Sequence, residues 1–177
     1  IGGDATILDW LVRHLRPGAD AVPPAEVAVV VQERAKYERM YNRAEYHSND
    51  AVLATARELL LRFDLKPPAT VLDVGCGPGA LTGVLSDLVG MNATAAIDPT
   101  DSFITACRER HPGVDVRQGS AEAIPFEGAE FDAALAQLVL HFVSDATAAG
   151  REMRRVVKPG GAIAACVWDF ESGMEML

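Results

Sequence analysis

The stretch that decides the fold is residues 70–81, T-V-L-D-V-G-C-G-P-G-A-L. A short apolar run over residues 71–74 ends at three closely spaced glycines, Gly75, Gly77 and Gly79. Beyond them, apolar residues recur at helical spacing: Leu81, Val84, Leu85 and Leu88. This pattern predicts a buried parallel strand, a tight loop and the N-terminus of a helix.

The loop is suited to a ligand that approaches the backbone closely. Glycines carry no Cβ, and the free N–H groups at a helix start favour an anionic or acceptor-rich group. Asp73 places a carboxylate at the end of the strand, beside the loop. Because like charges repel, Asp73 disfavours a pyrophosphate and favours a ligand that carries an ammonium group or hydroxyls.

Residues 73–79, D-V-G-C-G-P-G, resemble motif I of the S-adenosylmethionine-dependent methyltransferases with a Rossmann-like fold. The same glycines fit the dinucleotide fingerprint G-x-G-x-x-G/A, so an NAD-dependent oxidoreductase is an alternative. Asp73 and further matches along the chain favour the methyltransferase. The resemblance implies that the cofactor S-adenosyl-L-methionine is bound by Asp73, Gly75, Cys76, Gly77 and Gly79.

Length and charge limit the function classes. A chain of 177 residues with 49% hydrophobic content predicts one soluble domain with a substantial core. The net charge of −9 argues against a broad nucleic-acid interface, which needs clustered Lys and Arg. No apolar run approaches the length of a membrane span, and the start shows no signal-peptide pattern. We therefore expect no nucleic-acid or membrane partner and a cytoplasmic location.

Cysteine and histidine spacing gives no metal pattern. The three cysteines, Cys76, Cys107 and Cys166, are widely separated, and the histidines are scattered. An odd number of cysteines without a C-x-x-C pair fits a reducing compartment, in which each acts as a small apolar residue. We expect no metal site.

The N-terminal part is predicted to be helical. Periodic apolar residues indicate helices over residues 5–15, from Pro23 to about Arg43, and again after residues 48–50. We expect residues 1–47 to form a helical extension and residues 48–177 to form the cofactor-binding domain. The resemblance implies that Tyr46 lies over the methionine end of the cofactor, where its ring face attracts the sulfonium.

A second strand is expected over residues 93–97, and it ends at Asp98. An acid 23 residues beyond Gly75 is suited to accept hydrogen bonds from both ribose hydroxyls of an adenosine. The alternative is that Asp98 only caps the turn before Pro99. NAD enzymes share this acid. The resemblance implies that Pro99 and Phe103 also bind the cofactor, with Phe103 against the adenine. For Phe103, packing between helix and sheet is the alternative.

A third strand over residues 114–117 precedes residues 119–126, G-S-A-E-A-I-P-F, which resemble the family's G-D-A-x-x-L-P-F stretch. The resemblance implies that Ser120 and Ala121 contact the adenine. Ser120 stands where the family usually has Asp, so its hydroxyl lacks charge assistance unless Glu122 takes over. We expect Glu122 to lie in the first turn of a helix, facing solvent.

A fourth strand over residues 131–137 brings Gln137 to the edge at which open α/β sheets bind ligands. It resembles the family's F-D-x-V strand, and the resemblance implies that Gln137 lies beside the methionine part of the cofactor and binds it. His141 follows shortly after and is the candidate catalytic residue, able to hydrogen-bond or deprotonate a methyl acceptor. A structural histidine is the alternative, because transfer from a sulfonium needs mainly alignment and desolvation.

The last match is V-K-P-G-G at residues 157–161, a turn between a helix over residues 145–157 and a fifth strand over residues 162–167. We expect a doubly wound α/β sheet of five parallel strands in the order 3-2-1-4-5. The fifth strand would be an open edge unless a partner copy covers it, so a homodimer is one arrangement that we expect.

The predicted function is methyl transfer to an O, N or C nucleophile of a small molecule. The alternatives are an NAD-dependent oxidoreductase and a non-catalytic cofactor-binding fragment.

Overall fold

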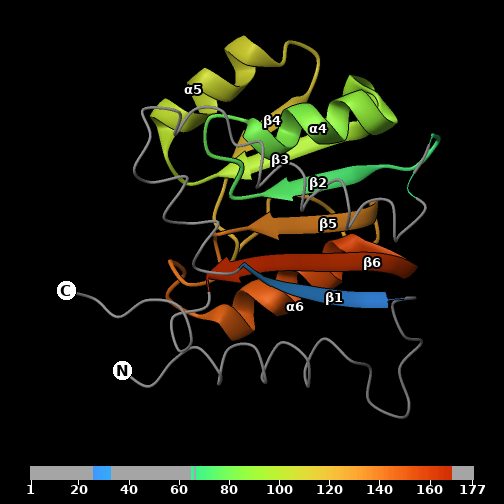
Figure 1. Cartoon of the computed structure of the whole chain (residues 1–177), viewed down its shortest axis with the longest axis vertical. Coiled ribbons are helices and arrows are strands. Elements are labelled where there is room, and N and C mark those ends of the chain that lie inside the picture. The colour runs from blue at the N-terminus through green and yellow to red at the C-terminus, as the bar shows by residue number, and fades with distance from the viewer. Residues whose placement is uncertain (1–25, 33–64, 66, 169–177) are drawn as a thin grey trace.

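The computed structural model describes residues 26–32, 65 and 67–168, with backbone alone for residues 26–32 and 166–168. Within these ranges, parallel strands form one six-stranded sheet with the order β1-β6-β5-β2-β3-β4 (Figure 1). The strands are β1 (Glu26–Gln32), β2 (Val71–Val74), β3 (Thr94–Asp98), β4 (Asp115–Gln118), β5 (Phe131–Gln137) and β6 (Val157–Trp168). The helices are α4 (Ala80–Val89), the short 3-10 helix η1 (Met91–Ala93), α5 (Asp101–Arg110) and α6 (Ala146–Val156).

The core lies on both faces of this sheet, because alternate residues of a strand point to opposite faces. On one face, Val71 of β2 packs with Leu81 and Leu85 of α4, and α5 continues this layer beside β3 and β4. On the other face, Leu72 packs in one cluster with Met153 of α6. The expected doubly wound arrangement is confirmed, and β4-β3-β2-β5-β6 reproduces the predicted order of five strands.

The N-terminal prediction is wrong over residues 26–32. The helix expected from Pro23 to Arg43 is replaced there by β1, which pairs in parallel with β6 from Glu26↔Ala162 to Gln32↔Trp168. The segment E-V-A-V-V-V-Q is rich in valine, whose branched Cβ favours a strand. β1 covers the edge of β6, so the reason for expecting a partner copy there no longer holds. The helices expected over residues 5–15 and after residue 48 lie outside the described residues.

The predicted entry into the last strand also differs. β6 begins at Val157, opposite Phe131, and its register with β5 then shifts so that Ala133 pairs with Ala162. The residues expected to form a tight turn are therefore an irregular segment inside the strand, with Gly160 at φ 81°. The preceding helix is confirmed: Asp145 caps α6 by accepting a hydrogen bond from the N–H of Ala148.

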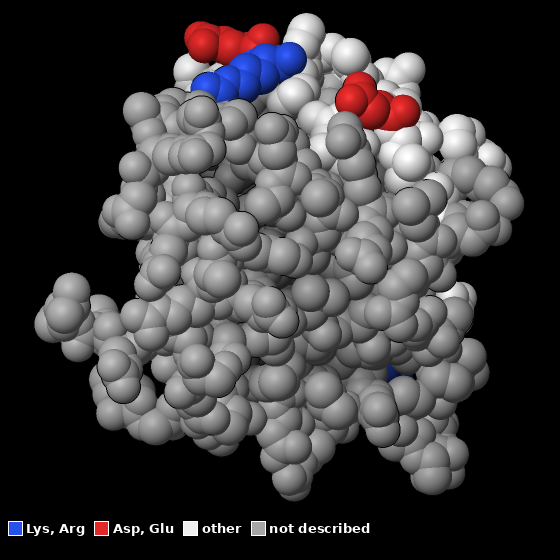
Figure 2. Space-filling view, in the orientation of Figure 1, with Lys and Arg blue, Asp and Glu red and all other residues white. Residues whose placement is uncertain are grey.

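None of the described helices is both long and apolar enough to cross a membrane. On the face seen in Figure 2, the described side chains that are visible include acidic and basic groups side by side. The six strands of the described residues are parallel, so the carboxyl ends of β2, β3, β4 and β5 meet at one edge of the sheet (Figure 1).

Candidate functional site

The site is built on the loop of residues 75–79, which joins β2 to α4. The N–H groups of Gly75 and Cys76 both donate to the carbonyl oxygen of Ile97, at 2.8 and 2.9 Å. The N–H of Gly77 donates to Oδ2 of Asp98 at 2.9 Å. The loop is therefore tied to the end of β3 by backbone groups at three successive residues.

The three glycines meet different surroundings. A Cβ on Gly75 would lie 2.4 Å from Cγ2 of Val139, and a Cβ on Gly79 would lie 2.7 Å from the His111 ring. A Cβ on Gly77 would meet nothing within 4 Å. All three have positive φ, at 74°, 52° and 95° along the chain. Gly75 and Gly79 are thus needed for packing, whereas Gly77 leaves open space where a ligand can reach the backbone.

Asp73 lies at the end of β2 with only 1% of its surface exposed. Its Oδ2 accepts a 2.6 Å hydrogen bond from the Thr82 hydroxyl, and its Oδ1 is buried with no partner among the described residues. Burial raises the pKa of Asp73 to about 7, and the charge of Asp98 adds to this rise. A cation bound nearby would favour the ionised form and lower this pKa.

Asp98 ends β3 and is also buried. Its Oδ1 accepts from the N–H of Thr100 at 2.8 Å, while its Oδ2 accepts from Gly77. An ionised carboxylate has about four acceptor positions, so both oxygens keep capacity for further donors. The structure therefore brings Asp73 and Asp98 to the same edge on neighbouring strands, with the glycine loop bonded to one of them.

Two cysteines meet at the loop: Cys76 is part of it, and Cys107 of α5 lies in the same buried cluster. Cys76 and Cys107 are both buried free thiols, and Cys107 Sγ contacts the Thr82 hydroxyl at 3.7 Å. The hydrogen bond with Cys107, and then burial, raise the pKa of the Cys76 thiol. Cys76 is therefore a neutral thiol at physiological pH and has the character of a packing residue rather than a nucleophile.

The residues expected near an adenine lie around the ends of β3 and β4. Phe103, in the first turn of α5, is 44% exposed, and Pro99 is exposed as well. The N–H of Gly119 donates to the carbonyl of Asp98 at 3.1 Å, which holds Ser120 beside the end of β3. Ser120 is half-buried, and Ala121 is buried.

The expectation for Glu122 is wrong. Residues 120–123 form a turn rather than the start of a helix, and the Glu122 carboxylate does not simply face solvent. One carboxylate oxygen accepts from the Ser120 hydroxyl, and the other accepts from the N–H of Ser144 at 2.8 Å. These hydrogen bonds lower the pKa of Glu122, and the bond from Ser120 has the largest effect. Glu122 thus joins the segment after β4 to the segment after β5.

The end of β5 supplies the other side of the site. Gln137 is half-buried at the last position of β5, and His141 follows within a turn in which the N–H of Phe142 donates to Val139. The rings of His141 and Phe142 are 4.5 Å apart, and Phe142 is 80% exposed. Val139 is the residue that approaches Gly75, so the β5 loop packs directly on the glycine loop. Tyr46 lies outside the described residues.

Sequence reasoning missed the residues that support the loop from below. Sequence reasoning assigns no role to His111, yet its ring Nε2 lies 2.8 Å from the carbonyl oxygen of Gly79, and the ring packs on Gly83. Thr82 holds Asp73. Thr82 gave a usable signal, because it is a polar residue within the apolar face of α4. His111 gave none, since its contact depends on how α5 packs beside α4.

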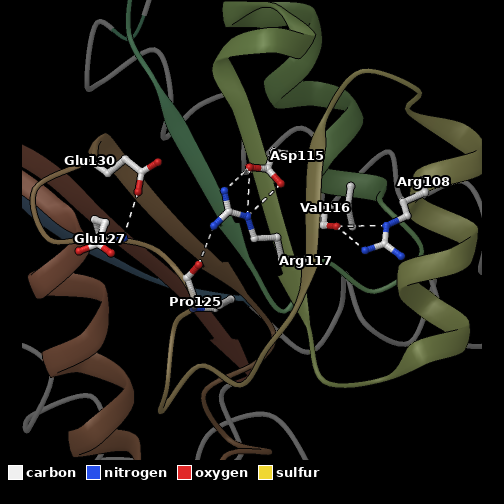
Figure 3. A network of polar contacts seen from close by, with 7 residues as sticks. All are labelled: Arg108, Asp115, Val116, Arg117, Pro125, Glu127 and Glu130. Carbon is white, nitrogen blue, oxygen red and sulfur yellow. Dashed lines mark hydrogen bonds and ion pairs between the residues drawn. The ribbon is translucent and has the colours of Figure 1, made fainter.

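The segment that carries Ser120 is fixed by two arginines. The Arg117 guanidinium donates to the Asp115 carboxylate and, at 2.8 Å, to the carbonyl of Pro125 (Figure 3). It also lies 3.9 Å from the centre of the Phe126 ring. From α6, Arg155 donates to the carbonyls of Ile124 and Phe126, each at 2.8 Å. Ser120 and Glu122 are therefore held by a well-bonded loop.

Comparison with known proteins gives a family match over the same region. The family described as "Methyltransferase domain" matches residues 72–165, just over half of the chain. Malonyl-[acyl-carrier protein] O-methyltransferase of Pseudescherichia vulneris is 31% identical over 137 residues, which cover 76% of this chain and 54% of that protein. Trans-aconitate 2-methyltransferase of Azoarcus sp. is 31% identical over 109 residues, covering 62% of this chain and 43% of that protein.

A solved structure agrees with the fold. The YcgJ protein of Bacillus subtilis superimposes with a TM-score of 0.56 at 26% identity, covering 63% of this chain and 48% of that one. The chain spans about half the length of the two curated relatives.

Proposed function

The chain belongs to the methyltransferase-domain family, and from this premise we propose that it binds S-adenosyl-L-methionine and transfers the methyl group to a small molecule. The bound cofactor supplies a methyl group activated by a positively charged sulfur. The proposal concerns the chain as part of an enzyme whose relatives are about twice as long.

The observation that carries the proposal is the arrangement of two buried carboxylates around the open backbone at Gly77. Asp98 has acceptor capacity beyond Gly77 and Thr100, which suits the two ribose hydroxyls. Asp73 has a buried oxygen without a described partner and a pKa near neutrality. A cationic ligand beside it would offset the cost of that buried charge.

The remaining predicted residues fit around this pair. Glycines 75, 77 and 79 shape the loop for the methionine part, and Cys76, within the loop, packs into the buried cluster with its side chain. We assign the adenine contacts to Phe103, whose ring is exposed, and to the bonded Ser120–Ala121 segment. Tyr46 is retained as a proposed contact to the methionine end.

We assign the acceptor side to Gln137 and His141 at the end of β5. Their role is to align the acceptor nucleophile with the methyl group and to exclude water, since methyl transfer from a sulfonium depends mainly on alignment and desolvation. His141 would in addition accept a proton from an acceptor that loses one. The names of the two relatives describe transfer to malonyl-[acyl-carrier protein] and to trans-aconitate, so a small carboxylic acid or its thioester is a reasonable first acceptor to test. A cytoplasmic location is proposed with this activity, where such acceptors occur.

The experiment is a thermal-unfolding series of the chain with S-adenosylhomocysteine or NADH. A ligand that binds only the folded state stabilises it by about 2.7 kcal/mol at one hundred times its Kd. We expect S-adenosylhomocysteine to raise Tm and NADH to leave it unchanged. The reverse result would replace the proposal with an NAD-dependent enzyme, although the family match gives that alternative no support.

A further inference from the structure

We propose that Glu122 fixes the direction of the Ser120 hydroxyl, and that this makes the site select a 6-aminopurine over a 6-oxopurine. The inference rests on the proposed function, because it requires an adenosine cofactor whose base lies at Ser120. Glu122 acts on the ligand through Ser120 and does not contact the ligand itself.

The hydrogen bonds around Ser120 are reciprocal. Its hydroxyl donates to Oε2 of Glu122, and its Oγ accepts from the Glu122 N–H at 3.1 Å. The other carboxylate oxygen, Oε1, accepts from the N–H groups of Ser144 at 2.8 Å and Asp145 at 3.3 Å. Both oxygens of Glu122 therefore act as acceptors at once, which only a carboxylate can do.

The surroundings keep this pair in place at the ligand edge. Gly119 is bonded to the Asp98 backbone, so Ser120 lies one strand beyond the proposed ribose site. The segment is fixed on its other side by the bond from Ile124 N–H to Glu152 at 2.9 Å and by the bond from Arg117 to Pro125 (Figure 3). Because the segment is held on both sides, the bond to Glu122 sets the direction of the Ser120 hydroxyl.

A serine hydroxyl has one donor and two acceptor positions, and it normally rotates to suit its ligand. Here the proton is committed to Glu122, and one lone pair is committed to the Glu122 N–H. What remains for a base is an acceptor position, strengthened by the charged partner. The 6-amino group of adenine donates to it, whereas the 6-oxo group of hypoxanthine would place two acceptors face to face. Glu122 in this way compensates for the absence of an aspartate at position 120.

The experiment is calorimetric titration of the chain with S-adenosylhomocysteine and with S-inosylhomocysteine, its 6-oxo analogue. We expect the wild type to bind the adenine form at least about tenfold more tightly, which corresponds to about 1.4 kcal/mol. In Glu122→Gln a single amide oxygen cannot serve both Ser120 and Ser144, so the ratio should fall below about threefold. Adding Ser120→Asp to this variant should restore it, because a carboxylate accepts in either orientation. Glu109→Gln, at an exposed position of α5, is the matched control and should leave the ratio unchanged.

Ser120→Ala tests the same inference in a second variant, because it removes the hydroxyl and leaves the Glu122 bonds to Ser144 and Asp145 in place. It should also bring the ratio below threefold. The inference is overturned if Glu122→Gln weakens both ligands equally, because that is the result of a merely structural role. A wild type that binds both ligands equally overturns it as well. A wild type that binds neither overturns the proposed function instead, and the inference with it.

Discussion

The Thr82 hydroxyl donates a 2.6 Å hydrogen bond to Oδ2 of Asp73, and this bond joins the first turn of α4 to the end of β2. The second oxygen of Asp73 is buried without a partner among the described residues. Burial first, and the charge of Asp98 in addition, raise the pKa of Asp73 to about 7. The molecule therefore holds a carboxyl group that ionises near neutral pH directly beneath the proposed cofactor loop.

The first prediction concerns the pH dependence of stability. The pKa of Asp73 is about 7 in the folded state and 3.8 for the ordinary group, so the folded state binds a proton that the unfolded state has lost. Its contribution to the free energy of unfolding is full below about pH 4 and is lost as the pH rises through 7, by at most about 4 kcal/mol. Asp73→Asn cannot ionise and keeps an acceptor for Thr82. Urea unfolding at pH 5 and pH 8 should show a smaller loss of unfolding free energy in the variant than in the wild type, by roughly 2 to 3 kcal/mol.

The control is Asp115→Asn, which alters an exposed carboxylate paired with Arg117. It should keep the pH dependence of the wild type, because exposed ion pairs contribute little. Equal losses in the wild type and in Asp73→Asn would show that Asp73 is already ionised at pH 5.

The second prediction separates two glycines of the loop. In Gly75→Ala the new methyl group meets Val139 at 2.4 Å, and φ is positive, so we expect a loss of roughly 2 to 5 kcal/mol in unfolding free energy. In Gly77→Ala the methyl group enters open space, and the loss should be about 1 to 2 kcal/mol. The folded Gly77→Ala chain should nevertheless bind S-adenosylhomocysteine at least about tenfold more weakly in calorimetry, a cost of about 1.4 kcal/mol. Undiminished binding would mean that no ligand approaches the backbone at this residue.

The central part of the fold could be predicted because local signals agreed with one another. Apolar runs that stop at Gly75 or at Asp98 mark strand ends, and parallel strands place those ends at one edge. The predicted helix faces followed from periodicity, as at Leu81 and Leu85, which are buried.

The errors have a common physical cause, which is pairing between distant segments. Val27, Val30 and Val31 have helical spacing, but residues 26–32 pair with β6, more than a hundred residues away. Glu122 was misjudged for the same reason, because its bonds to Ser144 and Asp145 are invisible in a local pattern. The Ser120-x-Glu122 spacing could have indicated a side-chain turn.

The third prediction concerns the support given by His111. Its ring N–H donates to the Gly79 carbonyl at 2.8 Å, and the ring fills the space beside Gly79 and Gly83. His111→Ala should lower the unfolding free energy by roughly 1 to 3 kcal/mol and weaken binding of S-adenosylhomocysteine, because the Gly79 carbonyl keeps only the donor from the Gly83 N–H and the packing of the ring is lost. Arg110→Ala is the matched control: it removes a bond to the neighbouring Pro78 carbonyl, but at an exposed position. If the two variants behave alike, His111 does not support the loop.

The last prediction tests Asp98 as the ribose acceptor. Asp98→Asn retains one oxygen, which cannot serve both Gly77 and Thr100 and carries no charge for a ribose hydroxyl. We expect calorimetry to show roughly 10 to 100 times weaker binding of S-adenosylhomocysteine, equivalent to about 1.4 to 2.7 kcal/mol. The wild type should also lose affinity for the 2′-deoxy analogue, whereas the variant should bind both forms about equally.

The comparison with the deoxy analogue distinguishes direct contact from structural damage to the loop. A distorted loop would weaken both ligands and leave their ratio as in the wild type, which would contradict a ribose contact at Asp98. The same variant should also lower the pKa of Asp73, because the charge of Asp98 contributes to its rise. Asp98→Asn should therefore lose less stability between pH 5 and pH 8 than the wild type, and this second readout does not depend on any ligand.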